Sequence, residues 1–291
     1  MNTPRPYLRI GIFVVGLLAV FGAAAAIGSA FEPAQTQDGG MEGTMEEHAT
    51  EADGAHEAAA PAGLGISDDG RTLRLATTQL ERGERGLLRF EIEDVDGSPV
   101  TEFDQLHERR MHLIVVRRDG TEFRHLHPEM DAEGAWTVPV RFDQPGAYRA
   151  FADFSVEGKQ ETLAGDVFVS GGEFEARPFP PPQPLDTTNG YEVSLQAGDL
   201  HAGEHSALIF EVRRNGEAVD DLAPYLGAKG HLVALREGDL AFLHVHPEEE
   251  GGPNQIAFEA TFPTAGRYRL YLQFKHDGAV QTAQFTVTVA R

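Results

Sequence analysis

A segment that combines three histidines with a tight hairpin signal has the strongest chemical potential in this sequence. It covers residues 112–128, and Asp119-Gly120 lies between its two apolar halves. A two-residue Asp-Gly turn joins antiparallel strands and fixes their register. This register places His112 opposite His127, and His125 projects to the same face because side chains alternate along a strand. We therefore expect three imidazoles to cluster at the open end of the hairpin.

A second segment further along the chain predicts the same arrangement. Gly238-Asp239 is the equivalent turn and sets His231 opposite His246, with His244 on the same face. The order of the two turn residues is reversed, yet the register of the histidines is unchanged. The two segments therefore predict one histidine cluster each.

Clusters of three imidazoles are typical of sites for zinc or copper, with a fourth position left for water or a partner's ligand. The expected metal ligands are His112, His125, His127, His231, His244 and His246. Met111, Asp153 and Gln273 are further candidate ligands whose positions the sequence does not fix. The alternative is that the histidines are structural and bond to loop carbonyl groups.

The face that carries the histidines also carries large apolar side chains, and we expect it to be the core face of each domain. These side chains are Ile114, Val116 and Phe123 in the first segment and Val233, Leu235 and Phe242 in the second. Trp136, Phe154 and Phe274 are expected in the core, and His107, His201, His205 and His276 at the surface. A metal site would then lie where the core meets the end of a domain.

The two segments belong to an internal repeat with a period of about 120 residues. Leu88-Arg-Phe-Glu91 matches Leu208-Ile-Phe-Glu211, and Pro145-Gly-Ala-Tyr148 matches Ala265-Gly-Arg-Tyr268. The first copy reads as short strands near 71–76, 86–93, 111–117, 121–127, 135–142, 147–155 and 161–169. About seven such strands in about 100 residues predict an immunoglobulin-like sandwich. The expected fold is all-β, with two tandem immunoglobulin-like β-sandwiches after an N-terminal transmembrane helix.

The N-terminal region predicts export of everything that follows it. Residues 10–31 carry no charge, and as a helix they would span about 33 Å, enough for a bilayer. Arg5 and Arg9 precede this run and no Lys or Arg follows before Arg71, which places the N-terminus in the cytoplasm. We expect a single-pass membrane anchor. A signal peptide cleaved near residues 28–30, and hence secretion, is the alternative.

The expected organisation has six parts. They are a cytoplasmic N-terminus (1–9), the anchor or signal segment (10–31), an acidic linker (32–62), the first sandwich (63–170), a Pro-rich linker (171–186) and the second sandwich (187–291). The acidic linker is too poor in apolar residues to form a core, so we expect disorder. It is either a spacer or a loose metal-gathering arm, because it contains Met41, Met45, His48 and His56.

Composition excludes several classes of function. The formal charge of −22 argues against nucleic acid as a partner. The absence of cysteine excludes disulfides and thiolate metal sites. No phosphate-binding loop, nucleophile elbow or zinc-protease motif is present, so we expect no enzymatic activity.

The strand histidine, the hairpin, the His-x-His-Pro motif, the Gly-x-Tyr motif and a late Phe together resemble the YtkA-like and FixH-like exported domains. That resemblance implies an immunoglobulin-type sandwich related to the CopC type and a role in copper or heavy-metal handling. The expected function is thus a membrane-anchored extracytoplasmic metal-binding protein, acting as a chaperone, buffer or sensor for copper or zinc. The alternative is an interaction module without metal that docks on a membrane protein.

Overall fold

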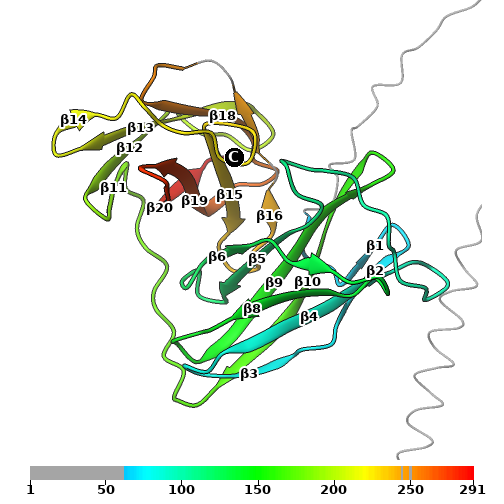
Figure 1. Ribbon diagram of the computed structural model, residues 1–291. Helices are drawn as coiled ribbons and strands as arrows, with labels where there is room; N and C mark the ends of the chain where they lie inside the picture. The colour runs from blue at the N-terminus through cyan, green and yellow to red at the C-terminus, as the bar shows by residue number, and fades with distance from the viewer. Residues whose placement is uncertain (1–61, 244, 249–250) are drawn as a thin grey trace, which may run out of the picture. The chain divides into compact units, whose positions relative to one another are not determined.

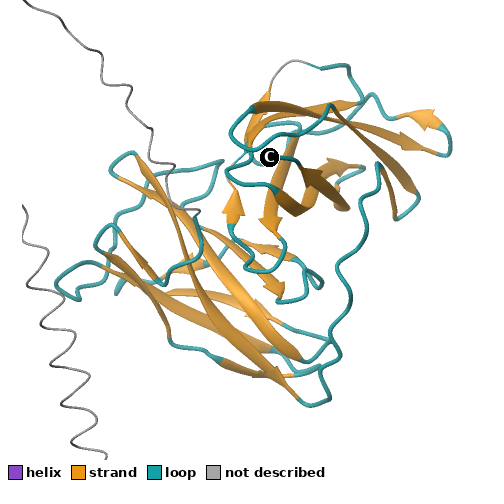
Figure 2. Ribbon diagram, turned by 180° about the vertical axis from the view of Figure 1, so that it is seen from behind, coloured by secondary structure: helices purple, strands orange, loops and turns teal. Residues whose placement is uncertain are grey.

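The computed structural model describes residues 62–291 except positions 244 and 249–250. The expected anchor at 10–31 and nearly all of the acidic linker lie outside these residues. The described chain consists of strands and loops, as the secondary-structure colouring in Figure 2 shows. Within this part of the chain, no helix has the length and apolar character needed to cross a membrane.

The first repeat forms two five-stranded sheets (Figure 1). One sheet has the order β1-β2-β4-β8-β7, from β1 (Ser67–Asp68), β2 (Arg71–Leu75), β4 (Gly86–Glu93), β8 (Trp136–Val140) and β7 (Glu129–Met130). The other has the order β3-β10-β9-β5-β6, from β3 (Gln79–Glu81), β10 (Lys159–Ser170), β9 (Gly146–Val156), β5 (His112–Arg117) and β6 (Arg124–Leu126).

The second repeat has the same plan. Its first sheet runs β11-β12-β13-β18-β17, with β14 (Glu217–Ala218) beside β13, from β11 (Leu185–Thr188), β12 (Tyr191–Ala197), β13 (His205–Arg214), β18 (Gln255–Thr261) and β17 (His246–Glu248). Its second sheet runs β16-β15-β19-β20, from β16 (Phe242–Leu243), β15 (Gly230–Arg236), β19 (Gly266–His276) and β20 (Ala279–Val289).

These strand orders are those of an immunoglobulin-like sandwich. The orders β2-β4-β8-β7 and β12-β13-β18-β17 correspond to A-B-E-D, while β5-β9-β10 and β15-β19-β20 correspond to C-F-G. A tyrosine corner accompanies the order in both copies: Tyr148 donates to Gln144 O at 2.8 Å, and Tyr268 donates to Thr264 O at 2.9 Å. The predicted all-β class and tandem arrangement are therefore confirmed, and the Gly-x-Tyr motif of the sequence marks these corners.

Each repeat has a hydrophobic core of its own, formed by alternate residues of its strands. In β4 the side chains of Leu88, Phe90 and Ile92 are buried, and the intervening Leu87 and Arg89 are exposed. The matching residues of β13 have the same alternation. Burial of one face of each sheet against the other is the main stabilising contribution in such a sandwich.

A third apolar cluster lies between the repeats, which belong to one compact unit. Its buried members are Ile114, Val116, Phe151, Ala164, Val233, Leu235, Leu240, Phe242 and Tyr271. The expectation that this face belongs to each domain's core is wrong, because Leu113 and Val115, on the opposite face of β5, point into the first core. Both faces of β5 are consequently buried.

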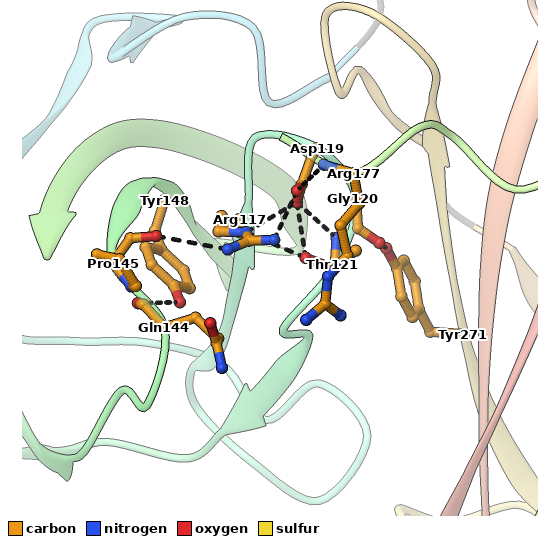
Figure 3. Close-up of polar contacts among 9 residues, drawn as sticks. All are labelled: Arg117, Asp119, Gly120, Thr121, Gln144, Pro145, Tyr148, Arg177 and Tyr271. Carbon is orange, nitrogen blue, oxygen red and sulfur yellow. Dashed lines mark hydrogen bonds and ion pairs between the residues drawn. The ribbon is translucent and has the colours of Figure 1, made fainter. Parts of the chain in front are cut away.

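The hairpin turn after β5 touches the second repeat (Figure 3). Asp119 accepts hydrogen bonds from Arg117 Nε at 3.0 Å and from Thr121 N at 3.2 Å, which hold the turn. Tyr271 donates its hydroxyl to Gly120 O at 2.7 Å, and its ring stacks on Phe123 with centroids 4.1 Å apart.

We expect Tyr271→Phe to lower the free energy of unfolding by about 1 kcal/mol. The substitution keeps the stacked ring but leaves the carbonyl oxygen of Gly120 without this donor. Urea denaturation followed by fluorescence would measure the change. Tyr148→Phe, which removes a hydrogen bond within one repeat, is the matched control. An unchanged midpoint for Tyr271→Phe would mean that the inter-repeat hydrogen bond does not contribute to stability.

Candidate metal centre

The register of the first hairpin is the predicted one. In β5 and β6, Leu113 pairs with Leu126 and Ile114 with His125, which leads to His112 and His127 as the next opposed residues. One ring nitrogen from each of the three histidines lies within 4.8 Å of the others. The ring centroids of His112 and His127 are 5.2 Å apart, and those of His125 and His127 are 4.8 Å apart.

The second hairpin does not build the expected second cluster. Its register begins as predicted, with Ala234 opposite Leu243, but the chain then leaves this sheet. His246 lies in β17, pairs with Glu259 of the other sheet and is exposed. His244 lies outside the described residues. The expectation that His231 faces His246 is therefore not met.

His231 instead joins the histidines of the first repeat. Its ring centroid lies 4.7 Å from that of His125 and 5.6 Å from that of His112, with interplanar angles of 28° and 10°. On its own sheet it pairs with Gln273 of β19. Among the residues that the structure describes, one histidine cluster between the repeats thus takes the place of one cluster per repeat.

His107 is a fifth histidine of this cluster, and the expectation that it lies apart at the surface is wrong. Its ring centroid is 6.1 Å from that of His112 and 5.6 Å from that of His231. It sits in a tight turn closed by hydrogen bonds in both directions between Leu106 and Arg109. His107 and Glu108 have φ angles of 49° and 64°, a pairing typical of type I′ turns, which glycine and asparagine usually occupy.

The hydrogen bonds of two cluster members fix which ring nitrogens keep a lone pair. His112 donates Nε2–H to Leu106 O at 2.7 Å, because a carbonyl oxygen can only accept. His125 donates Nδ1–H to Gln273 Oε1 at 2.7 Å for the same reason. In the neutral rings, His112 Nδ1 and His125 Nε2 then both present lone pairs, and these atoms lie 2.9 Å apart. Two facing lone pairs repel each other unless a cation lies against both.

His127 contributes a third available nitrogen. Its Nε2 is buried and has no hydrogen-bond partner among the described residues. Leaving a buried polar atom unpaired costs about 1–3 kcal/mol. Together with the lone pairs of His112 Nδ1 and His125 Nε2, the unpaired nitrogen of His127 could bind a cation.

Burial lowers the pKa of four of the five clustered histidines, which are therefore neutral at physiological pH. Desolvation lowers the pKa of His112 and of His127 to about 4. It also lowers the pKa of His125 and of His231 well below the usual value, and neighbouring histidines add to the effect. Neutral imidazole is the form that binds a metal ion, so these side chains need not lose a proton first.

The three additional candidate ligands have different positions. Met111 packs in the core of the first repeat. Asp153 is buried opposite His112 in β9 and accepts a hydrogen bond from Thr162 at 3.0 Å. Gln273 orients His125 through its side-chain oxygen. Gln273 and Leu106 O thus occupy the positions of groups that orient metal-binding histidines from behind.

The remaining histidines lie elsewhere. His276 is buried, against expectation, between the Tyr191 hydroxyl at 2.7 Å and Asp221 Oδ1 at 2.9 Å. His205 is exposed as expected and pairs with Glu259, and His201 lies within 3.2 Å of the carbonyl oxygen of Arg291. Trp136, Phe154 and Phe274 are in the cores, as predicted.

Several solved structures are distantly similar to this chain. A DUF4426 family protein from Pseudomonas aeruginosa is 10% identical, with a TM-score of 0.29, over 37% of this chain and 97% of its own. The Escherichia coli adhesin FdeC is 12% identical, with a TM-score of 0.27, over 77% and 65%. The Lin-41 filamin domain is 12% identical, with a TM-score of 0.25, over 39% and 100%. No curated protein matches the sequence.

Comparison with protein families gave a clear match. Residues 66–171 and 186–291 each match the family described as a domain of unknown function (DUF8832). The two matches coincide with the two sandwiches and cover more than half of the chain. The chain therefore belongs to this family and carries two copies of its domain.

Proposed function

We propose that this chain is a membrane-anchored extracytoplasmic protein that binds copper or a related transition metal, through one site built on His112, His125 and His127. The uncharged run at 10–31, preceded by Arg5 and Arg9, supports the anchor and its orientation. The likeness of the hairpin motifs to YtkA-like, FixH-like and CopC-type domains supports a role in metal handling. Buffering, delivery and sensing are all consistent with such a site.

The observation that carries the proposal is the convergence of lone pairs at the cluster. Structural histidines would direct their nitrogens outward to separate carbonyl groups. Here His112 and His125 each use one nitrogen to bond a protein oxygen and turn the other toward the same point. Metal-binding histidines almost always donate their second N–H in this way.

The charge of the ligand set favours copper(I). The three imidazoles are neutral and buried, so they do not offset the charge of a bound ion. The cost of burying an ion rises steeply with its charge, and a monovalent ion therefore suits this cluster better than a divalent one. Copper accepts imidazole ligands, as does zinc, which is the competing metal.

The alternative of a docking module without metal finds less support in the same features. Its natural docking surface would be the apolar face of the C-F-G sheet. In each repeat this face is already covered by the other repeat. A further partner would have to bind elsewhere.

The test is a metal titration of the full-length protein in detergent with Cu(I), Cu(II) and Zn(II), using a chromophoric chelator as competitor. We expect the protein to bind one equivalent of metal tightly, and Cu(I) more tightly than the other two ions. The double change His125→Ala and His127→Ala should lower the affinity at least about 100-fold. His246→Gln removes an exposed imidazole and is the matched control. Weak additional binding that persists in the double variant would be assigned to the Met- and His-containing segment 32–62.

A parent protein that binds no metal above the level of the double variant would overturn the proposal. The histidines would then be structural, and a membrane protein partner would become the leading hypothesis. Tight binding of zinc in preference to Cu(I) would retain the site and reject the assignment of its metal.

A further inference from the structure

The two repeats meet through equivalent surfaces. Ile114 and Val233 occupy matching positions of the repeat, as do Val116 and Leu235, and all four are buried in the cluster between the sandwiches. The histidines lie along the same faces, since His112 and His231 are the first matched pair of these strands. The histidine cluster is therefore the polar end of the inter-repeat contact.

The second repeat contributes to the cluster twice. The ring centroid of His231 lies 4.7 Å from that of His125 and 5.6 Å from that of His112, but its ring nitrogens are not among the three that lie within 4.8 Å of one another. Gln273, its neighbour on β19, accepts the Nδ1–H of His125. Without the second repeat, His125 would lose the partner that fixes its tautomer.

We propose that the second repeat completes the metal site, with His231 turning its ring to become the fourth ligand when metal binds, so that metal binding locks the two repeats together. This inference rests on the proposed function of the His112, His125 and His127 cluster and assigns its regulation. The first repeat supplies three nitrogens, and structural sites for tetrahedral ions are closed by four. The ion would then bind the docked arrangement of the repeats in preference to a separated one.

Linkage gives this arrangement a measurable consequence. A ligand that binds one of two states shifts the equilibrium toward that state in proportion to its concentration over its dissociation constant. Metal at 100 times its dissociation constant would favour the docked repeats by about 100-fold. Acquiring or losing the ion would thus change how firmly the two sandwiches hold each other.

The experiment compares the full-length protein with His231→Gln, and with His231→Asn as a second variant of smaller side chain. Metal affinity is measured by chelator competition with Cu(I), and the number of imidazole ligands by X-ray absorption spectroscopy of the Cu(I) form. We expect a loss of affinity of about 10-fold or more in both variants, and one imidazole fewer, with one equivalent still bound. His246→Gln is the control for loss of a histidine outside the cluster.

A second readout follows the repeats themselves. The chain has no cysteine, so spin labels on Val95→Cys and Glu217→Cys, one exposed position in each repeat, are the only labelled sites. Double electron–electron resonance should give a narrower distance distribution with Cu(I) than with a chelator, and no narrowing in His231→Gln.

The outcomes separate this inference from the proposed function. If the parent binds metal and both His231 variants bind equally tightly with the same ligand count, the inference is wrong and the three-histidine site stands. The same conclusion follows if the distance distribution does not respond to metal. If the parent binds no metal, the proposed function fails first and this inference with it.

Discussion

Acidification from pH 7 to pH 5 is expected to lower the unfolding free energy of the metal-free protein by several kcal/mol. Burial lowers the pKa of His112 to about 4, and the unfolded value is 6.5. Between these values the unfolded chain binds a proton that the folded chain does not, so stability rises with pH and is lost as pH falls. For His112 alone the loss at pH 5 is about 2 kcal/mol.

Three other histidines of the cluster shift the stability in the same direction. The pKa of His127 is lowered to about 4, and those of His125 and His231 are lowered well below the usual value, in each case mainly by burial. Glu161 opposes them, since burial raises its pKa and its protonation on acidification favours the folded state. Because four histidines are destabilised by acidification and only Glu161 is stabilised, the net effect of lowering the pH is to destabilise the folded protein.

Urea denaturation at pH 7, 6 and 5 with a chelator present would measure this dependence. Asp104 and Asp119, whose pKa values lie below the usual range, titrate below the window and do not contribute within it. The control is His112→Gln combined with His125→Gln, which removes two of the titrating groups and should flatten the slope. A parent whose stability is constant from pH 7 to pH 5 would show that the histidines are not held neutral in the fold.

The first hairpin shows how much of the site could be predicted from sequence. The paired residues of β5 and β6 are those that a two-residue Asp119-Gly120 turn predicts, through His125. The turn itself differs from the prediction: Arg117 N donates to Thr121 O across a three-residue loop, and Glu122, at a φ of 56°, restores the predicted pairing. Because the turn and both strands are adjacent in sequence, no long-range contact was needed for the prediction. The core positions of β4, where apolar and polar residues alternate, were predictable for a similar reason.

The direction in which the histidines face was not predictable. Both faces of β5 are apolar, since Leu113 and Val115 alternate with Ile114 and Val116. Alternation identifies a core face only when the other face is polar. Burial of both faces is itself the signal of a second packing partner, and here that partner is the other repeat.

Two further features depend on contacts that a local pattern does not contain. After Leu243 the chain leaves β15 and pairs with β18, which takes His246 to the other sheet. His107 occupies a tight turn, and the equivalent position in the second repeat is Leu226, which has a similar φ of 57°. Alignment of the two copies reveals that turn only after the fold of one copy is known.

Leu235→Asp is expected to have the largest effect on the contact between the repeats. Leu235 is fully buried in the inter-repeat cluster and is not part of the core of its own repeat. An aspartate there would lose apolar burial and bury a carboxylate beside its cross-strand neighbour Arg269, at a cost of about 3 kcal/mol. The cost falls on docking, because Leu232 and Ala234, on the other face of β15, still pack in the core.

We therefore expect Leu235→Asp to separate the repeats while each sandwich stays folded. Urea denaturation should change from one transition to two, and hydrogen exchange should rise at the β5 and β15 faces but not in the cores. Val280→Asp, at an exposed apolar position of the same repeat, is the control and should change stability by less than about 0.5 kcal/mol. If His231 also completes the metal site, Leu235→Asp should weaken Cu(I) binding although it touches no ligand. A single transition at an unchanged midpoint would show that the contact between the repeats contributes little to the stability of the protein.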